Sequence, residues 1–164
     1  MALRKMLGSV QDAPIQTLMA LIETQSRETL TSWAVTYVEA HYLPLTPEPR
    51  LAAAVSAVKA NLPLKETKKY LADARKAAQE QRDPVVQAAA RAVATACGVV
   101  TTPTNALGFC FYGAAAYAYH TAGVKESAGV YDALAQEELN RLLKSLLAVA
   151  VENEPNPVSI QWGC

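Results

Sequence analysis

The chain has 164 residues, of which 51% are hydrophobic, and its 15 basic residues balance 15 acidic ones. A chain of this length can bury one sizeable hydrophobic core, so we expect one domain over residues 1–164. Because the formal net charge is zero, no overall field attracts nucleic acid or an anionic membrane, and neither is expected as a partner.

The predicted elements are all helical, because alanine occurs 31 times and no alternating strand pattern is present. Capping residues precede prolines at Asp12–Pro14, Thr46–Pro47, Asp83–Pro84 and Thr102–Pro103, which predicts four helix starts. Apolar spacing predicts two helices in 14–43 and one each in 47–61, 64–82, 84–100, 103–122 and 129–151. We therefore predict an all-α, single-domain bundle of about six or seven mostly antiparallel helices, with extended termini at 1–13 and 152–164.

Residues 92–124 contain no Asp, Glu, Lys or Arg. A membrane-spanning helix needs about 20 consecutive apolar residues, but residues 101–105 (TTPTN) divide this block into two shorter pieces. The pattern favours two neighbouring core helices over a membrane segment. The N-terminus lacks the apolar run of a secretory signal, and the three cysteines form no CxxC motif. We therefore expect a cytoplasmic protein.

Few residues indicate catalysis. The two histidines, His41 and His120, have no partners at metal-ligand spacing, so neither a metal site nor a cofactor is predicted. If the helices of the uncharged block pack antiparallel, Cys97 and His120 could meet as nucleophile and base, although Cys97 lies on a predicted core stripe. An alternative hypothesis is therefore an enzymatic or ligand-binding pocket between the helices of residues 84–122. Its predicted lining is Thr95, Cys97, Asn105, Tyr112 and His120.

The segment LKETKKYLADARK is a basic helix face that could contact an acidic partner. Tyrosine offers a large contact area with a polar tip and is enriched at interfaces. The residues predicted to bind a partner are Lys65, Lys68, Lys69, Arg75 and Tyr131. The leading hypothesis is a non-enzymatic binding protein that acts through a protein–protein interface, and self-association into a homo-oligomer stays open.

Several segments also resemble a known family in their order along the chain. They are SRETLTSWAVTYVEAHYLPL, TPEPRLAAAVSAVKANL, ARKAAQEQRDPVVQAAARAVATA and NALGF followed by AAAYA, and they span residues 27–120. Together they are similar to small bacterial immunity proteins. The resemblance implies an all-helical protein that neutralises a toxin by binding it.

Overall fold

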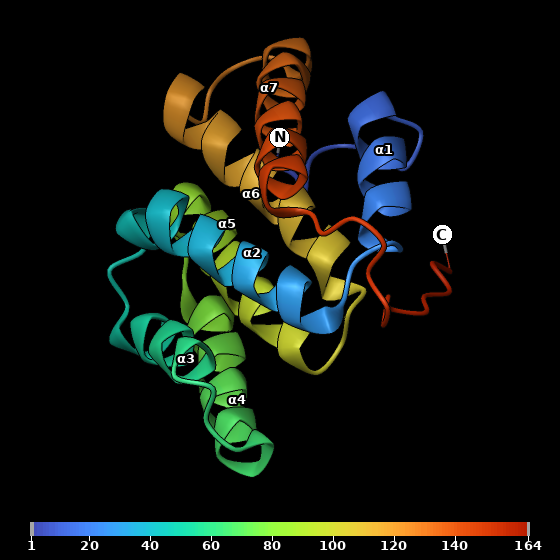
Figure 1. Ribbon diagram of the computed structural model, residues 1–164. Coiled ribbons are helices and arrows are strands. Elements are labelled where there is room, and N and C mark those ends of the chain that lie inside the picture. The colour runs from blue at the N-terminus through green and yellow to red at the C-terminus, as the bar shows by residue number, and fades with distance from the viewer. Residues whose placement is uncertain (1, 164) are drawn as a thin grey trace.

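In the computed structural model, which describes residues 2–163, seven α-helices pack around one core and no strand is present in that range (Figure 1). The helices are α1 (Ala13–Ile22), α2 (Arg27–His41), α3 (Pro49–Lys59), α4 (Leu64–Glu80), α5 (Pro84–Cys97), α6 (Asn105–Ala122) and α7 (Ala128–Val149). Two short 3-10 turns, η1 (Leu43–Leu45) and η2 (Gly98–Val100), follow α2 and α5. The predicted all-α fold is confirmed. Met1 and Cys164, at the outer ends of the predicted extended termini, lie outside the described residues.

Capping side chains start three of the helices. The Asp83 carboxylate accepts a hydrogen bond from the Val86 N–H at 3.0 Å, which confirms the predicted start of α5. Ser26 and Ser127 cap α2 and α7 in the same way. Each cap satisfies a backbone N–H that has no partner within its helix.

Two of the predicted helix starts are wrong. α3 begins at Pro49 and not at Pro47, because Glu48 precedes a proline and is held in the extended region at φ −106° and ψ 116°. α6 begins at Asn105 and not at Pro103. Its first turn is tightened instead, since the Asn105 N–H donates to the Thr102 carbonyl at 3.0 Å.

The uncharged block forms the centre of the molecule. α5 and α6 lie side by side, with Thr95 facing Gly108 near their shared turn, while Tyr119 lies beside the start of α5. This order makes the pair antiparallel. Alanines bury almost completely on both helices, and small side chains allow the close approach. Within residues 2–163, no helix has both the length and the hydropathy required to span a bilayer.

A buried carboxylate at this centre joins α7 to the C-terminal end of α2. Glu138 of α7 is 3% exposed and accepts hydrogen bonds from the hydroxyls of Tyr37, at 2.8 Å, and Tyr42. Its other oxygen accepts from Arg141 Nε at 2.9 Å. On α6, a Cβ at Gly113 would lie 2.6 Å from Tyr42 Cε2, so the absence of a side chain there lets the Tyr42 ring reach Glu138. Tyr37 of α2 and Tyr42, which follows α2, thereby link this part of the chain to α7, and Tyr42 does so past Gly113 of α6.

Burial also sets how the fold responds to alkali. Burial raises the pKa of the Cys97 thiol to about 12 and that of Cys110 well above its ordinary value. Burial, followed by the charge of Glu138, raises the pKa of Tyr37 and Tyr42 as well. All four groups therefore keep their protons in the folded chain at a pH where the unfolded chain loses them.

We expect the free energy of unfolding to fall steeply with increasing pH above about pH 9, the ordinary pKa of a thiol. The unfolded state then binds fewer protons than the folded state. Each group therefore lowers the free energy of unfolding by up to about 1.4 kcal/mol per pH unit, and the tyrosines begin to contribute near pH 10. Urea unfolding between about pH 8 and 11 measures the slope. A Cys97→Ala/Cys110→Ala variant should show a shallower slope between about pH 9 and 10. If the free energy of unfolding did not change with pH in either protein, the raised pKa values of these buried groups would be contradicted.

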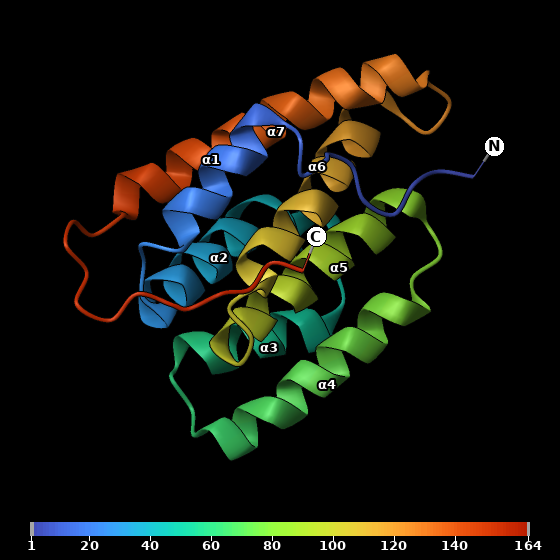
Figure 2. The same cartoon turned by 90° about the vertical axis from the view of Figure 1, so that its right-hand side faces the viewer.

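Figure 2 shows α4 along one side of the bundle and α7 along the opposite side, with the core helices α5 and α6 between them. α4 packs only one stripe, including Leu71, Ala74 and Ala78, against α3 and α5. The remainder of α4 faces outward. This arrangement leaves its basic residues free to border a surface hollow.

Candidate binding groove

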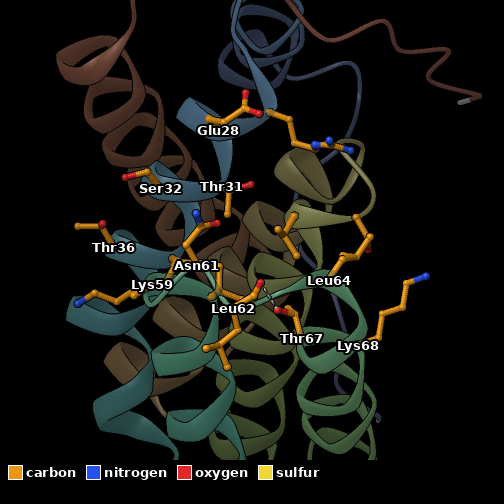
Figure 3. A pocket seen from close by; sticks show the side chains of 15 residues that line it. Glu28, Thr31, Ser32, Thr36, Lys59, Asn61, Leu62, Leu64, Thr67 and Lys68 are labelled. Carbon is orange, nitrogen blue, oxygen red and sulfur yellow. Dashed lines mark hydrogen bonds between the residues drawn. The ribbon is translucent and has the colours of Figure 1, made fainter.

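A groove of about 760 Å³ lies between α2, the loop that joins α3 to α4, the first turns of α4, and η2 (Figure 3). α2 contributes its outward face, and the α3–α4 loop passes opposite to it. Asn61 in this loop adopts a left-handed conformation at φ 55°, which turns the chain from α3 toward α4. Representative lining residues are Thr31, Thr36, Asn61, Leu64, Lys68 and Thr101.

The groove combines hydroxyl groups with exposed apolar surface. Thr31 Oγ1 is buried and has no hydrogen-bond partner among the described residues. The Thr67 hydroxyl, in contrast, donates to the carbonyls of Leu62 at 3.1 Å and Pro63 at 3.2 Å. Leu64 leaves 50% of its surface exposed although it is the first residue of α4. A partner could thus gain both apolar contact at Leu64 and a hydrogen bond at Thr31.

The electrostatics of the groove are positive. Arg27, Lys59 and Lys68 line it, and Glu28 is the one acidic residue in its lining. Lys59 pairs with Glu39 at 2.6 Å, whereas Arg27 and Lys68 form no ion pair with the described residues. Figure 3 shows Lys59 and Lys68 extending from opposite sides of the hollow. The positive dipole ends of α2 and α4 border the groove and add to this field.

The structure places four of the five predicted partner-binding residues on one exposed face. Lys65, Lys68, Lys69 and Arg75 all lie on the outer side of α4, and Lys68 also lines the groove. Tyr131 lies elsewhere and is 5% exposed. Its hydroxyl donates to the Gly123 carbonyl at 2.7 Å and accepts from the Glu126 N–H at 3.0 Å. It therefore holds the α6–α7 loop and leaves little of its surface exposed.

The five residues of the alternative ligand pocket are not gathered around one cavity. Asn105 closes the turn against Gly98, where a Cβ would lie 2.6 Å from Asn105 Nδ2, and the Thr95 methyl packs toward Gly108. Tyr112 is half-buried on α6. None of the five residues lines the groove.

The structure also separates the predicted nucleophile and base. Cys97 ends α5 beside the start of α6, and it is fully buried with a raised pKa. His120 is exposed at the other end of α6, fifteen residues beyond Asn105, which corresponds to about 22 Å along a helix axis. The two helices do pack antiparallel, but this arrangement places Cys97 and His120 at opposite ends of the pair, and Cys97 is buried as its position on a core stripe predicted.

Sequence reasoning missed most of the groove. Thr31 and Thr36 are ordinary polar residues of α2, and nothing local connects them to Asn61 or Thr101. One feature of the sequence could have indicated the groove, namely the positive charges at two helix starts. Arg27 and Lys65 are cations within the first turn of α2 and α4, where the helix dipole disfavours positive charge.

Comparison of the chain with known protein families identifies one family that matches it. The model of the family described as "Imm-5 like putative immunity protein" matches residues 20–145. The chain belongs to this family. No curated protein and no solved structure matches it.

The match to the Imm-5 like family covers the whole groove. It begins near the end of α1 and ends within α7, so all of α2 through α6 lies inside it. The N-terminal segment 2–12 and the C-terminal segment 150–163 lie outside the matched span. The resemblance to immunity proteins that the sequence indicated over residues 27–120 is thereby confirmed and extended at both ends.

Proposed function

We propose that this protein is an immunity protein that neutralises a toxin by binding it, and that the groove and the outer face of α4 form the contact surface. The membership of the Imm-5 like family supports the activity. The groove supports the location, because it is the part of the matched span that combines exposed apolar surface, an unpartnered hydroxyl and positive charge.

The charge of this surface defines the partner segment that fits it. Lys65, Lys68 and Lys69 lie within the first six residues of α4, beside the groove. A cation in the first turn of a helix is unfavourable by about 0.3–1 kcal/mol, so Lys65 costs stability in the free protein, and Lys68 and Lys69 add repulsion because they lie three and four residues further along the same helix. An acidic segment of the toxin would remove this repulsion and pair with them. We therefore assign an acidic segment of the toxin to the groove.

A charge reversal tests the surface. We expect Lys65→Glu/Lys68→Glu to weaken toxin binding about tenfold or more, because each change replaces an attraction with a repulsion. The same variant should unfold at an equal or slightly higher temperature, since Glu near a helix N-terminus is favourable by about 0.3–1 kcal/mol. The measurement is calorimetric titration with the product of the gene adjacent to this one, together with survival of cells that co-express both proteins.

The matched control is Lys125→Glu/Lys144→Glu, which changes the net charge equally at exposed sites outside the groove. It should bind the toxin like the parent protein. If the parent protein neither binds nor protects against the neighbouring toxin, the proposed function is wrong. If the parent protein protects and Lys65→Glu/Lys68→Glu protects equally well, the function stands and the assigned surface is wrong.

A further inference from the structure

A second hollow, of about 340 Å³, lies at the other end of the α5–α6 pair from Cys97 and Asn105. Its walls come from three parts of the chain: the N-terminal segment at Leu3–Lys5, the first two turns of α5, and the end of α6 with the loop that follows. Volumes of this size accommodate small organic molecules.

The hollow carries three cationic side chains. Arg4, Lys5 and Arg91 line it, and no Asp or Glu does so among the described residues. None of the three forms an ion pair within residues 2–163. Glu126 and Asp132 line the adjoining hollow instead. The first turn of α5, with Pro84 in the wall, adds the positive end of its helix dipole.

Arg91 supplies the most specific observation. Its Nη1 atom is buried and donates no hydrogen bond to any described residue. An unsatisfied buried donor destabilises the folded chain, and more so when it is charged. An oxyanion placed against this guanidinium would recover that cost, because arginine matches carboxylate and phosphate oxygens with paired N–H donors.

The N-terminal segment is held in position without any ligand. The Tyr119 hydroxyl donates to the Arg4 carbonyl at 2.6 Å, and the Leu7 N–H donates to the Phe111 carbonyl at 3.2 Å. Leu7 is 3% exposed and belongs to the core. The backbone that carries Arg4 and Lys5 is therefore ordered before binding, which lowers the entropic cost of forming a site.

We propose that this hollow binds a small organic oxyanion, with its phosphate or carboxylate group on Arg91, Arg4 and Lys5. Leu3 and Val124 would contact the organic part of the ligand. This site goes beyond toxin binding and does not depend on it, because Arg4 and Lys5 lie outside the span that the immunity family matches.

Calorimetric titration of the full chain at constant ionic strength tests the proposal. The probes are phenyl phosphate, benzoate, inorganic phosphate and, as a neutral control, benzyl alcohol. We expect saturable binding of phenyl phosphate or benzoate and none of benzyl alcohol. Tighter binding of phenyl phosphate than of benzoate would indicate a phosphate ligand, and the reverse order a carboxylate ligand. Binding of inorganic phosphate would show that the oxyanion binds without an organic part. No saturation by either aromatic anion below about 10 mM would overturn the proposal.

Variants locate the site. Arg91→Gln should weaken binding about ten- to a hundredfold, as expected for the loss of a charge-assisted hydrogen bond. Arg75→Gln, on the exposed face of α4, is the matched control and should change the affinity less than about twofold. If Arg91→Gln does not fold, Arg4→Gln/Lys5→Gln replaces it, since both side chains are exposed. Equal affinity in the parent protein and in the folded Arg91 or Arg4/Lys5 variant would place the anion elsewhere and refute the site.

Discussion

Glu138→Ala is expected to destabilise the protein by about 3–5 kcal/mol, a large part of the total stability of a small domain. The substitution removes the acceptor for both Tyr37 and Tyr42 and leaves their hydroxyls without it in the core. It also opens a cavity beside α2 and frees Arg141 from its partner. Urea unfolding followed by circular dichroism measures the loss.

Two further variants separate the causes. Glu138→Gln keeps an oxygen acceptor and the shape of the side chain but removes the negative charge, so it should cost less than Glu138→Ala. Glu137→Ala changes the neighbouring carboxylate, which is exposed, and should alter stability by less than about 0.5 kcal/mol. If Glu138→Ala were as mild as Glu137→Ala, the buried network would contribute nothing to stability.

Gly113→Ala is the second substitution with a large expected effect. The new Cβ would lie 2.6 Å from Tyr42 Cε2, so either the ring or α6 must move. Overpacking of this kind costs about 1–3 kcal/mol, and displacement of Tyr42 would also weaken its bond to Glu138. We therefore expect a loss of at least about 2 kcal/mol, measured by thermal or urea unfolding.

Gly129 provides a matched control for this substitution. It also lies in a helix, α7, but a Cβ there would meet no atom within 4 Å, and its φ lies outside the left-handed region. Gly129→Ala should stabilise the protein by about 0.4–1 kcal/mol, because alanine loses less backbone freedom on folding. Equal effects of the two substitutions would contradict the assigned role of Gly113.

The network around Glu138 was partly visible in the sequence. Glu138 is a charged residue on the same helical face as Leu142 and Leu146, which are fully buried. A charge inside an apolar stripe requires partners. Those partners come from α2 and the residue that follows it, about a hundred residues earlier, and no local pattern indicates that Tyr42 reaches Glu138 past Gly113. The signal was therefore present, but its meaning depended on packing.

The sequence predicted the basic face of α4 beside the groove, but of the three basic residues that line the groove it predicted only Lys68 as a contact residue. Exposure of Lys65, Lys68, Lys69 and Arg75 follows from the polar periodicity of α4, which leaves one narrow buried stripe. The sequence did not predict that Thr31 and Thr36 of α2 line the groove together with Thr101, because this depends on how α2, α4 and η2 approach one another. Tyr131 shows the same limit, since its burial depends on the path of the α6–α7 loop.

The sequence by itself determined the helices, the buried uncharged block and the basic face, because spacing, caps and prolines act within a few residues of the chain. It also indicated the family, through the order of its helical segments. Only the tertiary structure decided that Cys97 and His120 lie apart, that a groove forms beside α4, and that Arg91 faces a cationic hollow. These features join segments far apart in the chain, and their geometry follows from the packing of whole helices, which no local pattern specifies.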